Sequence, residues 1–111
     1  PAPRDVSPPR AVAVGRACTR ARRCTLTVAV SELEPSSGIA SVRARITFRA
    51  RCARRKLCTR TRTVSGRRRG DRLFLVQTPA LPRGRTTVRL TATDVAGNAQ
   101  SVPTIVRLRL R

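Results

Sequence analysis

The amino-acid sequence predicts a single all-β domain in which two antiparallel sheets pack as a sandwich. Apolar and polar residues alternate with a period of two in seven segments, and turn-forming residues separate these segments. No segment keeps an apolar stripe at helical spacing for three turns. The chain has 111 residues, of which 40% are hydrophobic, so it is long enough to bury a core. A helix-free barrel of seven strands is the alternative.

Residues 1–9 are rich in proline and are predicted to form a linker that leads into a domain at residues 10–111. The seven predicted strands follow in the order 10–14, 24–30, 39–51, 57–64, 71–78, 86–93 and 102–110. The predicted turns contain Gly, Pro, Asn, Asp or Ser, and they include residues 34–38, 65–71, 79–84 and 94–98.

The segment 39–51 alternates most clearly, with arginine or threonine on one face and apolar residues on the other. A sheet with one buried and one solvated face requires this pattern. The residues predicted to face the core are Val42, Ala44, Ile46, Phe48 and Ala50 here, with Leu26, Val28, Val30, Val88, Leu90, Ala92, Val106, Leu108 and Leu110 in other strands. Because the chain has no Trp, Tyr or Met and only two Phe, aliphatic side chains must fill most of the core.

Four cysteines form two Cys-x5-Cys pairs, Cys18 with Cys24 and Cys52 with Cys58. An even number of cysteines in a small domain predicts disulfides and an oxidising compartment. Pairing within each motif is favoured because each bridge would close a short loop between neighbouring strands. Crosswise pairing is the first alternative, because both loops should lie at one end of a sandwich. A zinc site is the second, although the five-residue gap exceeds the usual two to four.

The chain carries 25 Lys and Arg against 5 Asp and Glu, for a net charge of +20. A charge of this size repels itself and fits either a solvated surface or a polyanion site. In an immunoglobulin-like order of strands, segments 39–51, 86–93 and 102–110 share one sheet, which would align their arginines. The candidate polyanion-binding residues of this face and its adjoining loop are Arg43, Arg45, Arg49, Arg51, Arg54, Arg55, Arg89, Arg107 and Arg109. The scarcity of aromatic residues and the lack of a helix for a groove argue against nucleic acid as the ligand.

The composition argues against an enzyme. There is no His to act as a general base, and five carboxylates in the whole chain make paired acid–base chemistry improbable. We therefore expect no catalytic residues, no cofactor and no metal. We also expect no membrane-spanning segment, because no apolar run is long enough. The chain begins at Pro1 rather than at a methionine, so we expect it to be a fragment of a longer protein.

Three stretches carry a resemblance to a known family: SGIASVRARI at 37–46, TPALPRGRTTVRLTATD at 78–94 and DVAGNAQS at 94–101. They resemble bacterial immunoglobulin-like repeat domains of surface and secreted proteins. The resemblance implies an immunoglobulin-like sandwich in an extracellular or cell-surface protein. It also implies a non-catalytic spacer or adhesive module whose partners are neighbouring domains of the same chain. The alternative function is a module that binds an anionic wall polymer, an acidic glycan or a nucleic acid.

The DVAGN segment predicts a tight turn. Gly97 and Asn98 tolerate positive φ, and the Asp94 carboxylate can accept hydrogen bonds from turn amides. This structural role is favoured over a calcium site, because calcium needs several carboxylates and only Glu32 and Glu34 could join Asp94.

The two ends of the sandwich are predicted to differ in charge. The loops at 15–24, 51–58 and 79–86 carry only basic charges and should share one end. The acids should gather at the other end: Asp5, Glu32, Glu34, Asp71 and Asp94. In a tandem array, the basic end of one domain would then face the acidic end of the next.

Overall fold

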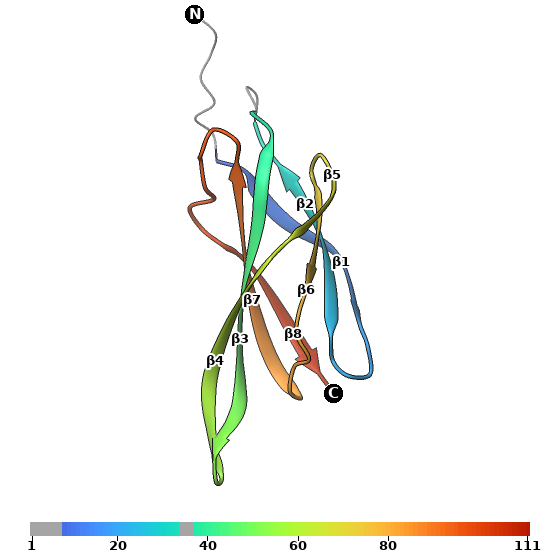
Figure 1. The fold of residues 1–111 in the computed structure, drawn as a ribbon, viewed down its shortest axis with the longest axis vertical. Coiled ribbons are helices and arrows are strands. Elements are labelled where there is room, and N and C mark those ends of the chain that lie inside the picture. The colour runs from blue at the N-terminus through green and yellow to red at the C-terminus, as the bar shows by residue number, and fades with distance from the viewer. Residues whose placement is uncertain (1–7, 34–36) are drawn as a thin grey trace, which may run out of the picture.

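A computed structural model describes residues 8–33 and 37–111 and contains two four-stranded antiparallel sheets that pack as a sandwich (Figure 1). The first sheet has the order β1-β2-β6-β5, and the second has the order β4-β3-β7-β8. The strands are β1 (Arg10–Cys18), β2 (Cys24–Ser31), β3 (Ile39–Ala53), β4 (Lys56–Ser65), β5 (Arg67–Gly70), β6 (Leu73–Gln77), β7 (Gly84–Asp94) and β8 (Thr104–Leu110). This is an immunoglobulin-like arrangement, in which the sheet of the third strand gains an extra edge strand.

The fold class is confirmed, and the number of strands is corrected from seven to eight. The additional strand is β5, which lies inside the segment 65–71 that the sequence predicted as a turn. As predicted, the segments at 39–51, 86–93 and 102–110 share one sheet, where they form β3, β7 and β8. Two separate sheets with four edge strands exclude the barrel alternative.

Pairing with β6, together with contacts to the opposite sheet, explains why residues 67–70 form a strand. The chain crosses between the sheets at Gly66, whose N–H donates to the Val42 carbonyl oxygen at 2.7 Å. A Cβ at this position would lie only 3.1 Å from that oxygen, so the crossing favours glycine. The Arg68 guanidinium then packs over the Phe74 ring at 4.8 Å and donates to the carbonyl oxygen of Ile39. These contacts fix β5 although its local sequence resembles a turn.

The core lies between the two sheets, where the predicted alternation is largely confirmed. Eleven of the fourteen residues predicted to face inward are buried: Leu26, Val28, Val30, Val42, Ala44, Ile46, Val88, Leu90, Ala92, Leu108 and Leu110. Phe48, Ala50 and Val106 are only partly buried. The reason at Phe48 and Ala50 is that β3 runs past the region that the first sheet covers. The largest buried side chain is Phe74, on β6.

Some boundaries differ from the prediction. β1 extends to Cys18 instead of ending at residue 14, with an irregularity between Ala13 and Gly15. Its extension is held by pairing with β2, in which Cys18 lies opposite Cys24. Pro9, which the sequence placed in the linker, is fully buried against the domain. The remainder of that linker, residues 1–7, lies outside the described residues.

The structure has two local disulfides, Cys18–Cys24 and Cys52–Cys58. Each closes a hairpin, the first between β1 and β2 and the second between β3 and β4. All four cysteines are therefore used, which excludes the crosswise pairing and the zinc site. Two disulfides in a small domain are typical of an oxidising, extracellular environment. Within the described part of the chain, no helix could cross a membrane.

Candidate polyanion-binding surface

The hairpin of β3 and β4 extends past the end of the sandwich (Figure 1). β3 pairs with β7 only as far as Phe48, which lies opposite Thr86. Beyond that point β3 pairs with β4 alone, so residues 49–60 form a free two-stranded ribbon, which we call the arm. Each of its two strands spans five residues, Arg49 to Ala53 and Lys56 to Arg60, which corresponds to a length of about 17 Å.

The arm has no core of its own and is held by a disulfide. Isolated two-stranded hairpins are marginally stable in water, because neither face is covered. In the arm, Cys52–Cys58 links the two strands next to the pairs Ala50 with Cys58 and Arg51 with Leu57. Closing a loop of seven residues stabilises the hairpin by about 2 kcal/mol in the chain-entropy model. The disulfide thus replaces the packing that holds the rest of the sheet.

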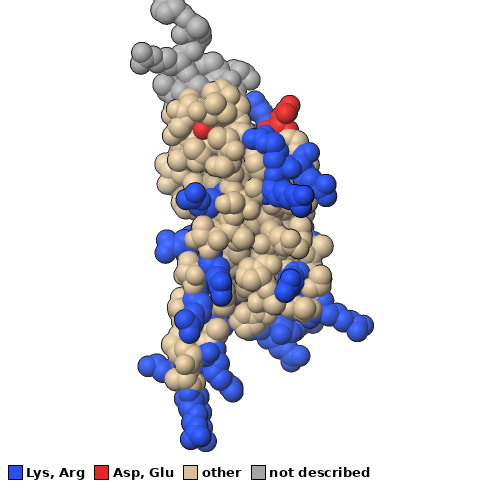
Figure 2. Space-filling model, in the orientation of Figure 1, with Lys and Arg blue, Asp and Glu red and all other residues tan. Residues whose placement is uncertain are grey.

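The arm carries basic charges and no acid. Its six basic residues are Arg49, Arg51, Arg54, Arg55, Lys56 and Arg60, all of them exposed. Figure 2 shows Lys and Arg side chains along the whole projecting hairpin. No carboxylate in the part of the chain that the structure describes pairs with any of them, so their charges are available to a ligand.

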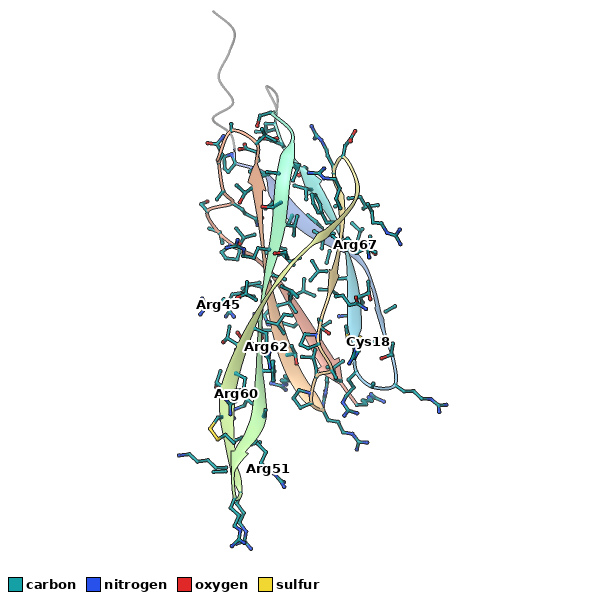
Figure 3. All side chains as sticks on the ribbon, viewed as in Figure 1. Cys18, Arg45, Arg51, Arg60, Arg62 and Arg67 are labelled. Carbon is teal, nitrogen blue, oxygen red and sulfur yellow. A yellow bond between two sulfur atoms is a disulfide. The ribbon has the colours of Figure 1, made fainter. Side chains whose placement is uncertain are left out.

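The basic residues lie on both faces of the arm. Arg49 and Arg51 point away from the sandwich, on the same side as Arg43 and Arg45. Arg60 lies directly opposite Phe48, and Arg62 lies opposite Ile46. Side chains of directly paired residues share a face, so Arg60 and Arg62 lie on the side of the core. They are exposed nevertheless, because the first sheet does not cover this part of β4. Figure 3 labels Arg51, Arg60 and Arg62 along the hairpin.

The outer face of the second sheet continues this surface onto the body of the domain. Arg45 lies directly opposite Arg89, and Arg85 lies directly opposite Arg109. Threonines fill positions between these pairs, as where Thr47 faces both Thr61 and Thr87. Like charges directly opposite each other destabilise a sheet by some tenths of a kcal/mol per pair. The face therefore has an electrostatic strain that a bound anion would relieve.

The predicted basic residues separate into two groups. The outer face of the body holds Arg43, Arg45, Arg89, Arg107 and Arg109, and the arm holds Arg49, Arg51, Arg54 and Arg55. The sequence analysis did not select Arg60, Arg62 and Arg85 for this site. The alternation of β4 could have identified Arg60 and Arg62, because it places both arginines on the same face as the half-buried Val64. Arginines at core-facing positions indicate that a strand has left the core.

Two arginines have a left-handed backbone, and they differ in what holds them. Arg22 has φ 61°, and its Nε donates to the Leu81 carbonyl oxygen at 2.7 Å. Arg55, at the tip of the arm, has φ 56°. Its side chain makes no hydrogen bond within residues 8–33 and 37–111. An L-residue in this conformation costs about 1–2 kcal/mol, and glycine avoids the cost. The tip therefore keeps a charged side chain where the backbone favours glycine.

This contrast predicts the effect of Arg55→Gly. Relief of the left-handed conformation offsets the greater entropy that glycine gives the unfolded chain, so we expect stability to change by no more than about 1 kcal/mol. Binding to heparin should weaken by about eightfold near 0.1 M salt, because one phosphate-type contact is lost. Urea unfolding and a heparin titration measure the two effects. A loss of stability with unchanged affinity would show that Arg55 serves the fold.

The turn after β7 uses Asp94 as an internal acceptor. Asp94 is buried, and its carboxylate accepts hydrogen bonds from the Asn98 backbone N–H at 2.7 Å and from the Asn98 Nδ2 at 3.0 Å. Gly97 has φ 94°, in the region where glycine is favoured. Both carboxylate oxygens thus serve the turn. No group of three possible metal ligands occurs among residues 8–33 and 37–111.

The described acids lie at one end of the sandwich, but they do not make that end acidic, because Arg67, Arg68 and Arg69 of β5 and Arg72 of the β5–β6 turn lie there as well (Figure 2). The β1–β2 and β3–β4 hairpin loops, and the β6–β7 loop that crosses between the sheets, all lie at the end that holds the C-terminus (Figure 1). The opposite end holds the end of β2 with Glu32, the β5–β6 turn with Asp71, and the end of β7 with Asp94. Asp5 and Glu34 lie outside the described residues. The arm is therefore remote from the described acids.

Comparison with known proteins does not identify a family. No protein-family model matches the chain, and no similar curated protein or solved structure was found.

Proposed function

We propose that this chain is a non-catalytic extracellular module that binds polyanions through the arm and the adjoining outer face of the second sheet. The observation that carries the proposal is the arm itself: six basic residues on a projecting hairpin that lacks a core and is held by a disulfide. Concentrating like charge there raises the cost of folding. The sandwich core lies elsewhere and does not need the arm, so the arm is better explained by a ligand than by stability.

The chemistry of the arm favours ligands with closely spaced phosphate, sulfate or carboxylate groups. A guanidinium binds such groups with two parallel hydrogen bonds, and exposed arginines on a narrow ribbon can reach several groups at once. A polyanion also releases condensed counterions when arginines replace them, which supplies much of the affinity. An anionic wall polymer, an acidic glycan and a nucleic acid all belong to this class.

The resemblance to bacterial immunoglobulin-like repeat domains supports a place within a larger secreted or surface protein. In that setting the module would also act as a spacer or adhesive domain beside its neighbours in the same chain. The arm projects from the basic end and would be held near the junction between domains.

Two variants with equal charge test where a polyanion binds. The arm variant carries Arg→Thr at positions 49, 51, 60 and 62, and the body variant carries Arg→Thr at positions 43, 45, 107 and 109. Each loses four charges. Threonine suits an exposed strand, so both variants should fold. For the arm variant we expect about a thousandfold weaker binding of heparin near 0.1 M salt, because each lost contact costs about fivefold to eightfold. For the body variant, the factor by which heparin binding weakens should be less than a tenth of this value.

The measurement is a heparin titration by calorimetry at several salt concentrations. Equal losses in the two variants would mean that net charge alone governs binding, and the arm would then have no special role. Binding that does not depend on salt would contradict a polyanion site altogether.

A further inference from the structure

We propose that the polyanion is double-stranded nucleic acid and that the arm lies in its groove. This inference rests on the proposed function and narrows its ligand. The observation behind it is that basic residues occupy opposite faces of the β3–β4 hairpin: Arg49 and Arg51 lie on one face of the arm, and Arg60 lies on the other. Arg62 continues the second face at the base of the arm, where β3 rejoins the three-stranded part of the sheet. A ligand that contacts both faces must present negative charge on both sides of the arm.

A duplex groove has this geometry, and a single linear polymer does not. Two phosphate rows border each groove, and the major groove of B-form DNA is about 12 Å wide, which admits a two-stranded β-ribbon. Neighbouring strands lie about 4.8 Å apart, so both strands of an arm that enters edge-on fit within the depth of the groove, which is about 8.5 Å. An arm lying along the groove would direct its two faces toward the two phosphate rows. A linear glycan or single strand could contact only one face at a time.

The sequence argument against nucleic acid relied on the lack of a helix for a groove. The structure removes that objection, because the arm is a ribbon of the kind that a groove accepts. The objection from aromatic residues applies to single strands, which stack their bases on aromatic side chains. Phe74 is buried and Phe48 is half buried, so neither offers a platform for stacking. The two arguments together favour a duplex over a single strand.

The disulfide and the tip suit this mode of binding. Cys52–Cys58 keeps the two strands together, so the opposed arginine pairs are held back to back before binding, which lowers the entropic cost of association. Arg54, Arg55 and Lys56 form the end of the ribbon and extend the contacts along the phosphates. Contacts to phosphates position a protein without reading bases. We therefore expect binding that tolerates any base sequence.

The experiment compares three double variants, each of which removes two charges: R49T/R51T on the outer face of the arm, R60T/R62T on its inner face and base, and R67T/R69T on the exposed strand β5 of the first sheet, outside the proposed surface. Fluorescence anisotropy measures binding to a DNA duplex of about 20 base pairs, to a single strand of the same length and to heparin, over a range of salt concentrations. Melting curves establish that each variant is folded.

We expect the unmodified chain to bind the duplex more tightly than the single strand or heparin. Both arm variants should weaken duplex binding by about sixtyfold near 0.1 M salt, and each should reduce the slope of log K against log salt by about two. The β5 variant R67T/R69T, which lies outside the binding surface, should change that slope by less than one unit. The important result is that both faces of the arm matter for the same ligand.

Groove binding is overturned if only one arm variant weakens duplex binding, or if the single strand or heparin binds as tightly as the duplex. In the second case, with the arm still required, the proposed function stands and the ligand is a linear polyanion. If neither DNA nor heparin binds in a salt-dependent way, the proposed function itself is wrong.

Discussion

Heparin at a hundred times its dissociation constant is expected to raise the melting temperature of this domain by about 10–20 °C. A ligand that binds only the folded state at that concentration adds about 2.7 kcal/mol of stability. For a domain near 100 residues, 1 kcal/mol corresponds to about 4–8 °C. The physical reason is the net charge of +20, because a polyanion relieves repulsion between closely spaced cations. The pairs Arg45 with Arg89 and Arg85 with Arg109 contribute to that repulsion directly.

Comparing two inorganic salts at equal ionic strength distinguishes binding of anions at a specific site from general screening of charge. Sulfate should raise the melting temperature more than chloride at equal ionic strength. Sulfate also stabilises proteins in general, so the variant with Arg→Thr at positions 49, 51, 60 and 62 serves as the control. The difference between the two salts should shrink in that variant. An equal response to sulfate and chloride in the unmodified chain would contradict an anion site on this surface.

Phe74→Ala is expected to remove about 3–5 kcal/mol of stability, which is a large fraction of the roughly 5–15 kcal/mol of an ordinary domain. Phe74 is the largest fully buried side chain and is 2% exposed. It lies opposite Val28 on one side and Arg68 on the other, and the Arg68 guanidinium packs over its ring. The core has no Trp, Tyr or Met that could move into the cavity.

Two further variants make this result interpretable. Phe74→Leu keeps most of the volume and should cost less than half as much. Leu57→Ala removes a side chain that is 56% exposed on the arm, and it should leave stability nearly unchanged. Urea unfolding followed by circular dichroism measures all three. A cost below about 1 kcal/mol for Phe74→Ala would mean that the ring does not organise the core.

Local patterns in the sequence were sufficient to predict the sandwich. The alternation in residues 39–51 identified both faces of β3, because side chains in a strand point to opposite sides at successive residues. The spacing of the cysteines was sufficient to favour the two local disulfides that the structure contains. The separation of charge between loops followed from strand order. The alternation, the cysteine spacing and the charge of each loop depend on residues that are close together along the chain, so they can be recognised from the sequence alone.

The formation of β5 and the exposure of the arm depend on the tertiary structure. Three successive arginines beside glycines resemble a turn, but they form β5 because they pair with β6, and Arg68 packs on Phe74 and binds the opposite sheet. Arg60 and Arg62 occupy core-facing positions that the sequence alone would place inside the domain or leave unassigned. Arg60 is exposed because β3 and β4 extend past the strands that cover them, and Arg62 is exposed because the first sheet does not cover the edge strand β4 at its position. Where a strand leaves the core depends on the lengths and packing of its neighbours. The sequence therefore determined which residues are basic and how they alternate, and the packing determined that they lie on both faces of one arm.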